Sequence, residues 1–248
     1  MRTRIITLLL IVFLILGFGA ASVSAQNQNQ DDAVESVGEP DPEELGIDSA
    51  QQKLRTVSVS KFEDAGFWDV SMPREQGLVT HRALPGSPID KEELEGEQEA
   101  GITEPDRNVM GVKVNFYKRG LNQFALFPAR PIPVEGISKT VSVWVVGRNS
   151  PHTLRLLIAD QFGNSGVITM GKLNFSGWKK LTAAIPTNIR QRDPHYQTRQ
   201  GIKIEGFRID CDPEETFGTY YIYFDALRAT TDLFSEESRD VDDMPDNW

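Results

Sequence analysis

The sequence has few of the residues on which cross-links, metal sites and catalysis usually depend. Its 248 residues include one cysteine, Cys211, and three histidines, and they contain no HExxH, GxSxG or phosphate-loop motif. A single cysteine excludes an intramolecular disulfide framework and a cysteine-based zinc finger. No nucleophile motif marks a catalytic centre, and geometry rather than residue content defines a catalytic triad. We therefore expect a protein that is not an enzyme and that is stabilised by burial of apolar side chains.

The few thiol and imidazole groups have structural interpretations. Cys211 lies on the apolar side of an alternating run, which predicts a buried and unreactive thiol. His152 follows a proline in a predicted turn, so we expect it at the surface or in the turn itself. His195 lies in a polar loop that is rich in arginine, and no motif surrounds His81.

Basic residues are outnumbered. There are 26 Lys and Arg residues against 36 Asp and Glu, a formal net charge of −10. Binding to nucleic acid requires an excess of cations to neutralise phosphates, so this balance argues against a nucleic-acid partner.

Long apolar runs are also missing, except at the beginning of the chain. Residues 5–21 are almost entirely apolar and follow Arg2 and Arg4, and small residues occupy positions 23–25. This pattern predicts a secretory signal peptide at 1–25, cleaved after Ala25, although the run also approaches the length of a membrane anchor. Cleavage removes two arginines, which changes the net charge from −10 to −12. We expect an exported, acidic protein that has no membrane segment after cleavage.

Acidic residues are concentrated in three segments. Residues 26–52 contain eight Asp or Glu and no Lys or Arg, which predicts a mobile arm. Residues 90–106 form an acidic insertion, expected to be a loop or a short exposed helix. Residues 232–248 form an acidic tail that ends in Trp248. Solvated charge is the simplest interpretation of each segment, but Trp248 could also anchor the tail on a neighbouring molecule.

Between these segments the hydrophobic period is two. Apolar residues alternate in 139–147, 153–160, 112–117, 124–126 and 202–205, and a last strand is predicted at 220–229. After Gly206 the alternation changes parity, so that Ile204 and Phe207 would both face inward, which predicts a β-bulge at the glycine. No segment longer than ten residues has a convincing helical pattern. The sequence predicts an all-β protein whose residues 53–231 form a single antiparallel β-sandwich of the jelly-roll type, like galactose-binding and carbohydrate-binding modules.

Asp225 is the most informative charged residue. It shares strand parity with Tyr223 and Leu227, so we expect it to be buried, and a buried carboxylate must be paired, hydrogen-bonded or bound to a metal. Modules with this pattern in the final strand often hold a structural calcium, for which Glu63 in the predicted first strand would be the second ligand. The alternative is a carboxylate bonded to backbone amides or to an arginine. No other cofactor is expected.

The tryptophans leave two interpretations open. Trp68, Trp144 and Trp178 lie in strand regions, where packing in the core is the default. A platform for sugars would need two of them exposed on one face.

A series of segments resembles the spirochaete flagellar filament outer-layer (sheath) protein family, FlaA. The resemblance covers roughly residues 53–248, and its order of motifs is specific although each motif alone is weak. It rests on segments 111–114, 117–120, 128–136, 143–149, 171–180 and 220–225, and on the acidic ending at 242–248. The resemblance implies a structural, non-catalytic protein of the periplasm that surrounds the flagellin core of periplasmic flagellar filaments and shapes their curvature for motility. Its expected partners are flagellin core subunits and other sheath subunits.

Several cations could make such contacts in an otherwise acidic chain. Acidic arms of one subunit could meet basic segments of the next, although these charges could equally well serve only solubility. The candidate partner-binding residues are Lys118, Arg119, Arg190, Arg192, Arg199 and Trp248. The alternative function is a secreted or periplasmic carbohydrate-binding module, which the same fold could support.

The predicted signal peptide gives a first testable outcome. N-terminal sequencing of the exported form should begin at Gln26, because residues 23–25 supply the small side chains that the signal peptidase needs. A form retained in the inner membrane with Met1 intact would contradict this expectation.

Overall fold

The computed structural model describes residues 39–43, 45, 52–94, 106–192 and 201–233. The part of the chain from Glu39 onward forms one compact unit. The acidic segments 26–38 and 234–248, and the middle of the 90–106 insertion, lie outside the described residues, as does the predicted signal peptide.

Strands dominate the described residues, as the period of two predicts. The single helical element among the described residues is one short 3₁₀ turn, η1. The described residues therefore contain no helix that is long and apolar enough to cross a membrane. The elements in chain order are β1 Leu54–Ser60, η1 Ala65–Phe67, β2 Trp68–Ser71, β3 Gly77–Pro85, β4 Asn108–Phe116, β5 Gln123–Pro128, β6 Ile132–Glu135, β7 Ile137–Val146, β8 Thr153–Ala159, β9 Ser165–Lys172, β10 Trp178–Ala184, β11 Gly201–Asp210 and β12 Thr219–Asp232.

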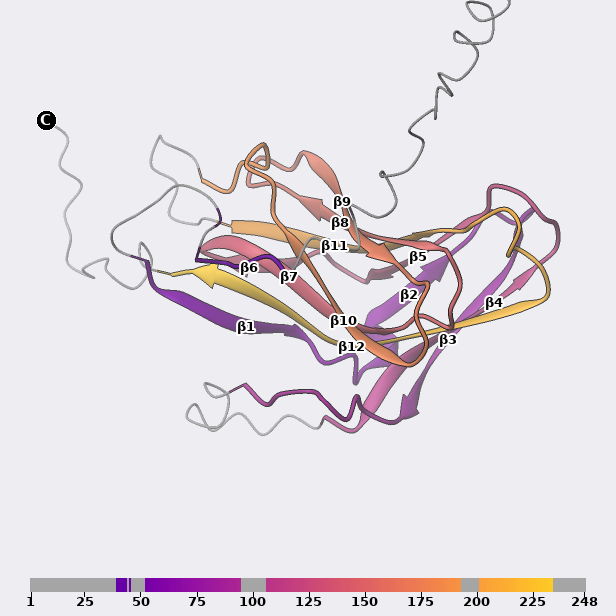
Figure 1. Ribbon diagram of the computed structural model, residues 1–248. Coiled ribbons are helices and arrows are strands. Elements are labelled where there is room, and N and C mark those ends of the chain that lie inside the picture. Colours follow the sequence, from indigo (N-terminus) through magenta and orange to yellow (C-terminus); the bar gives the residue numbers. More distant parts are fainter. Residues whose placement is uncertain (1–38, 44, 46–51, 95–105, 193–200, 234–248) are drawn as a thin grey trace, which may run out of the picture. The chain divides into compact units, whose positions relative to one another are not determined.

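The strands form two antiparallel sheets that lie against each other (Figure 1). The first sheet has the order β10-β7-β12-β4-β3, with β1 paired to β12, and the second has the order β2-β5-β11-β8-β9, with β6 paired to β11. Neighbours in space are mostly distant in sequence, so closure of the sandwich requires long-range pairing. The expected all-β antiparallel sandwich is confirmed.

The core lies between the two sheets and uses alternate residues of each strand. Val141, Val143 and Val145 of β7 are fully buried, as the alternation predicts. Phe224 of β12 stacks on Phe207 of β11, with 5.4 Å between ring centroids, and so joins the central strands of the two sheets. Aromatic contacts of this kind add about 0.5–1.5 kcal/mol to the stabilisation from buried area.

The predicted bulge in β11 is present. The register of β11 with β8 shifts between Ile204 and Gly206, and Ile204 and Phe207 are both fully buried. Gly206 has a φ of +132°, and a Cβ atom there would lie 2.4 Å from the carbonyl oxygen of Leu126. Both the left-handed backbone and the close approach of β5 therefore require glycine.

A second bulge, in β12, was not predicted. The register of β12 with β7 shifts between Asp225 and Arg228, and Ala226 has a φ of +45°. As a result Tyr223 and Asp225 lie on the outward face of the sheet, whereas Leu227 lies in the core. The expectation that Asp225 and Leu227 share a face is wrong, because the extra residue reverses the alternation between them.

The two ends of the sandwich carry different parts of the chain. At one end, Asn115 near the end of β4 pairs with Thr219 at the start of β12. At the other end, the start of β7 pairs with the end of β12 through Ile137 and Asp232. Figure 1 shows β12 running from the end with Asn115, on the right, to the end with Ile137, on the left.

The glycine in the β11 bulge can be tested against a glycine without close neighbours. Gly206→Ala should lower the free energy of unfolding by about 3 kcal/mol or more, because backbone strain of about 1–3 kcal/mol adds to a clash with β5. The matched control is Gly120→Ala, which has a φ of +143° but no atom within 4 Å of the added Cβ, and it should show the strain alone. Urea unfolding measures both, and equal losses would contradict the close approach of β5.

Candidate interaction surface

The outward face of the first sheet carries aromatic and cationic side chains over β12, β4 and β3. The register pairs Tyr223 with Gly111 and Gly111 with Arg82, while Tyr221 pairs with Lys113. Alternate residues of β12 fill the core, so Tyr221 and Tyr223 point outward from the sheet. Three adjacent strands thereby bring these side chains together although they lie far apart in sequence.

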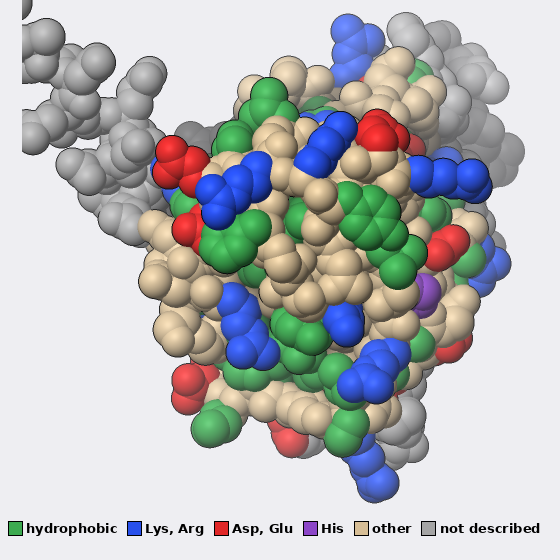
Figure 2. Space-filling view, turned by 90° about the vertical axis from the view of Figure 1, so that its right-hand side faces the viewer, with side chains coloured by type: hydrophobic (Ala, Val, Ile, Leu, Met, Phe, Trp, Pro, Cys, Tyr) green, Lys and Arg blue, Asp and Glu red, His purple; other side chains and the backbone are tan. Residues whose placement is uncertain are grey.

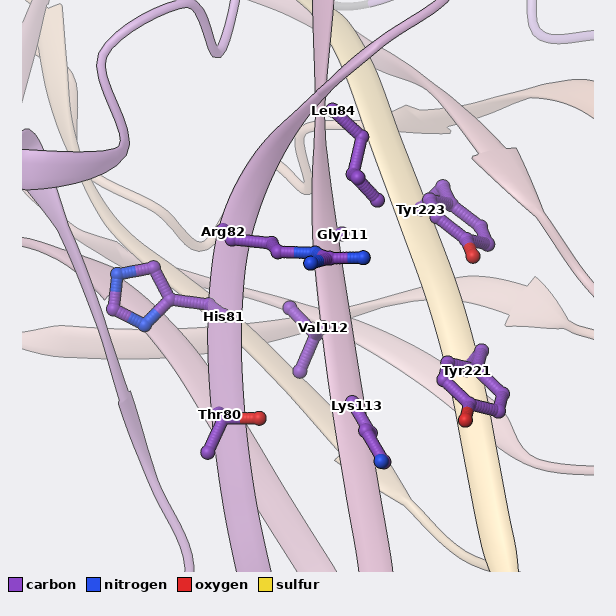
Figure 3. Close-up of a pocket in the computed structure, with 9 residues that line it drawn as sticks. All are labelled: Thr80, His81, Arg82, Leu84, Gly111, Val112, Lys113, Tyr221 and Tyr223. Atoms are coloured by element: carbon purple, nitrogen blue, oxygen red, sulfur yellow. The ribbon is translucent and has the colours of Figure 1, made fainter.

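A groove forms on this face because Gly111 has no side chain. A Cβ atom at Gly111 would lie 2.8 Å from Cδ1 of Leu84 and 3.1 Å from Cε1 of Tyr223. The hollow has a volume of about 270 Å³. We call it the Gly111 groove and define its outward-facing part by Arg82, Leu84, Gly111, Lys113, Tyr221 and Tyr223, which Figure 3 shows around the glycine.

The Gly111 groove is cationic. Arg82 and Lys113 are exposed, and no Asp or Glu is among the residues that line the groove. The Lys113 ammonium lies 5.7 Å from the centroid of the Tyr221 ring, and the exposed Arg148 guanidinium lies 5.4 Å from that of Tyr223. Within the described part of the chain, none of these three cations forms an ion pair with a carboxylate. The groove therefore combines two cations in its lining and a third beside the Tyr223 ring with two aromatic rings.

Cationic and apolar side chains are also mixed at one end of the sandwich. Figure 2 faces the side of the molecule that lies to the right in Figure 1, and there Lys and Arg side chains are interspersed with hydrophobic ones, with Asp and Glu mostly toward the edges. Despite a net charge of −10, the described sandwich therefore presents a face that can attract anionic groups.

A buried ion pair borders the groove on β12. Asp225 is fully buried on the outward face of the strand, and its Oδ2 accepts a hydrogen bond from Nζ of Lys91 at 2.8 Å. The same ammonium contacts Asp106 at 2.6 Å, so it joins the two ends of the 90–106 insertion to β12. Burial raises the pKa of Asp225 above its usual range, and Lys91 offsets part of that rise.

Glu63 binds the backbone at the start of β4. Its Oε1 accepts from the N–H of Asn108 at 2.8 Å, and its Oε2 accepts from Nδ2 of Asn108 at 2.7 Å. The structure thus gives Glu63 and Asp225 different partners. Among the described residues, no three His, Cys, Asp or Glu side chains gather as a set of metal ligands. Calcium binding by Glu63 and Asp225 stays a prediction.

Part of the acidic arm also lies on the outward face. Glu39 forms an ion pair with Lys180 of β10 at 2.8 Å and accepts a hydrogen bond from Thr182 at the same distance. These hydrogen bonds lower the pKa of Glu39. Exposed pairs of this kind contribute about 0–1 kcal/mol, so this contact is weak.

The structure separates the partner-binding residues predicted from the sequence. Lys118 and Arg119 are exposed in the loop after β4, where Arg119 lies 4.8 Å from the ring centroid of Phe217. Arg190 and Arg192 are exposed. They lie near the start of β11, since the carbonyl of Gln191 between them accepts a hydrogen bond from the N–H of Gly201. The two groups therefore lie at opposite ends of the sandwich. Arg199 and Trp248 lie outside the described residues, as does His195.

The tryptophans divide between the core and the outward face. Trp68 is buried and stacks on Phe62 with 4.7 Å between centroids, as the default predicts. Trp144 and Trp178 are half-buried on the outward face of the first sheet, where Trp144 pairs with Lys180 and Trp178 with Val146. Packing in the core is therefore wrong for these two.

His152 is the clearest correction to the sequence analysis. It is fully buried rather than at the surface, and its ring packs against Tyr220 with 4.7 Å between centroids. Its Nδ1 accepts a hydrogen bond from the N–H of Asp212 at 3.1 Å. Burial lowers its pKa to about 4, so the ring is neutral at pH 7. The prediction failed because His152 directly precedes β8 and its ring packs against Phe116 and Tyr220.

Cys211 is buried, as predicted. Burial is the main cause that raises the pKa of its thiol to about 12, which leaves the reactive thiolate almost unpopulated at pH 7.

The family model and the related sequences that match this chain agree on one family. Residues 24–240 match a family model described as flagellar filament outer layer protein FlaA. The chain is 36% identical over 205 residues to a flagellar filament outer layer-like protein of Brachyspira hyodysenteriae, covering 83% of this chain and 92% of that one. It is 30% identical over 171 residues to a flagellar filament outer layer protein of Spirochaeta aurantia, covering 54% of this chain and 51% of that one.

Among solved structures, the chain is similar to a family 11 carbohydrate-binding module from Clostridium thermocellum in complex with a mixed-linked tetrasaccharide. The TM-score is 0.40 at 12% sequence identity, and the match covers 73% of this chain and 96% of the module.

The buried ion pair yields a test with a defined pH dependence. Lys91→Met should lower the free energy of unfolding by about 3–5 kcal/mol at pH 7, because it leaves a buried carboxylate without a cation. The variant raises the pKa of Asp225 further. When folding raises the pKa of a carboxyl, the free energy of unfolding of the protein falls as the pH rises. The loss should therefore be smaller at pH 4, where Asp225 takes up a proton. Urea unfolding at the two pH values measures the difference.

Two controls separate the ion pair from the loss of a lysine. Lys91→Met combined with Asp225→Asn should recover much of the stability at pH 7, and Lys113→Met should change it by less than about 0.5 kcal/mol because Lys113 is exposed. A loss that does not depend on pH would contradict the buried pair. In a separate thermal unfolding experiment on the wild type, a melting temperature lowered by EDTA would support the calcium prediction.

Proposed function

The chain belongs to FlaA, the family of flagellar filament outer layer proteins, and we propose that it is a structural, non-catalytic subunit of the outer layer that surrounds the flagellin core of a periplasmic flagellar filament. The observation that carries the proposal is the family match, which runs through residues 24–240 and so includes every strand of the sandwich. In this function the subunit contacts flagellin subunits on one side and neighbouring outer-layer subunits laterally, and it shapes filament curvature.

The chemistry of the described residues supports a coat rather than a reaction centre. The buried thiol and the buried, neutral imidazole lack the activation that a nucleophile or general base needs. The outward face instead offers arginines and aromatic rings, and these residue types are enriched at protein–protein contacts. The predicted signal peptide would deliver such a subunit to the periplasm.

A carbohydrate-binding module is the second candidate function. The observation in its favour is that Tyr221 and Tyr223 point outward from adjacent outward-facing positions of one strand. Against it, Lys113 and Arg148 lie near these rings, and the groove of about 270 Å³ is small for an oligosaccharide. Tight binding to a defined glycan would favour this candidate.

Deleting the gene tests the coat function. Filaments of the mutant should keep their flagellin cores but become thinner or change curvature, with altered swimming, because a layer that surrounds the core adds to its diameter and bending stiffness. Electron microscopy of isolated periplasmic filaments measures thickness and shape, and re-introduction of the wild-type gene is the control. Filaments identical to wild type in thickness, shape and swimming would contradict the proposal.

A further inference from the structure

We propose that the Gly111 groove binds the acidic, aromatic segment 234–248 of a second copy of this chain, so that copies join head to tail. This inference rests on the proposed coat function, which supplies a reason for copies to associate, and it assigns the partner and polarity of one lateral contact. The ligand is an acidic peptide with an aromatic anchor, and the receptor is a groove of the same sequence.

The groove and the segment are complementary in charge. Arg82 and Lys113 line the groove and Arg148 lies over the ring of Tyr223, and none of the three has a carboxylate partner among the described residues. Segment 234–248 carries six Asp or Glu residues and one Arg. Carboxylates that approach the three cations replace water contacts with charge-assisted hydrogen bonds. Such complementarity also orients the encounter and accelerates association.

The groove and the segment are also complementary in apolar content. Leu84 and Tyr223 pack at the Gly111 position, and Tyr221 is 40% exposed at the edge of the groove. The volume of about 270 Å³ is below the range of about 300–1,000 Å³ typical of drug-sized ligands and suits a single large side chain. Segment 234–248 contains Phe234 and Trp248, whereas the acidic arm 26–52 contains no aromatic residue. This difference selects the tail over the arm as the occupant.

The topology favours a second copy over the same molecule. Tyr221 lies near the start of β12, and the segment leaves after β12 ends at Asp232. The strand between them spans about 36 Å at about 3.3 Å per residue. A flexible chain of the length of residues 234–248 has a root-mean-square span of only about 20 Å. A return to the groove of the same molecule would therefore require a strongly extended segment.

The direct return path is also occupied. Lys91 lies on Asp225, and the side chain of Arg228 donates a hydrogen bond to the carbonyl of Glu92, so residues 91–92 cover the outward side of β12 between the groove and Asp232. When the segment comes from a neighbouring copy, it can reach the groove without crossing residues 91–92 and without spanning the length of β12. Because the groove and the segment belong to opposite ends of β12, the contact is heterologous and can repeat without closing, as an open array on a filament requires.

Complementation between two variants of the exported chain tests the polarity. The groove variant carries Arg82→Glu and Lys113→Glu, both at exposed positions, and the tail variant carries Asp242→Lys, Asp243→Lys and Trp248→Ala. At low salt the wild type should form a concentration-dependent series of oligomers, and each variant alone should stay monomeric over the same range. A 1:1 mixture should form dimers and stop there, because each dimer uses the one intact groove and the one intact tail. Analytical ultracentrifugation measures all four samples.

A matched control keeps the test specific. Arg55→Glu with Lys203→Glu makes the same change of charge at exposed positions away from the groove, and it should associate like the wild type. Circular dichroism verifies that all variants are folded. Raising the salt from 0.05 to about 0.5 M should weaken wild-type association at least several-fold, because exposed charges are then screened within about 4 Å.

The outcomes that overturn the proposal are distinct. A mixture that stays monomeric, a groove variant that associates like the wild type, or a wild type that is monomeric up to about 1 mM would each contradict it. Loss of association only when residues 26–38 are deleted would assign the groove to the arm instead. Immunogold labelling of filaments separates this proposal from the coat function: absence of the chain from filaments contradicts the coat, whereas a coat with failed complementation contradicts only the head-to-tail contact.

Discussion

The neutralisation of one buried carboxylate organises the outward face of the first sheet. Asp225 lies in the central strand β12 at a bulge, where it has no contact with water. An isolated carboxylate in this position would be strongly unfavourable, so the chain must bring a cation to it. Lys91 supplies that cation from the β3–β4 connection, and Asp106 holds the same ammonium from the other end of the connection.

This pairing has consequences well beyond the two charges. It fixes residues 91–92 across β12 and so divides the outward face of the sheet into two parts. On one side of this division lies the Gly111 groove, with its unpaired cations, and on the other side β12 continues to the end from which segment 234–248 departs. A local requirement of electrostatics thereby separates the Gly111 groove from the C-terminal end of β12, and this separation is the reason why the contact that we propose uses two copies.

Much of the fold could be predicted from the sequence because its signals are local. Alternation of apolar residues predicted the strands, and the change of parity at Gly206 predicted a bulge that requires both its φ and its lack of a side chain. The bulge in β12 could not be found in this way, because Ala226 is not a glycine and aromatic residues occupy both faces of the strand just before it. The burial of His152 depends on contacts with Phe116 and Tyr220, which are distant in the sequence, so no local pattern encodes it.

The candidate site was missed for a related reason. Lys113, Tyr221 and Tyr223 occupy outward positions of their strands, where polar and aromatic residues are unremarkable taken one strand at a time. Their meaning comes from the register, which places Gly111 between Arg82 and Tyr223. A signal was nevertheless present, since a glycine within an otherwise apolar strand marks a bulge or a close approach. The predicted Lys118–Arg119 and Arg190–Arg192 clusters were identified by charge alone, and charge says nothing about which end of the sandwich each cluster occupies.

Contacts of the kind found on this face suit a layer built from many copies. An exposed ion pair such as Glu39–Lys180 contributes little by itself, and screening by salt weakens it further. An aromatic anchor adds specificity, because only a segment that both fills the groove and neutralises its cations satisfies both partners. On a filament, neighbouring subunits hold one another at a high effective concentration, so contacts that are weak in solution become nearly continuously occupied.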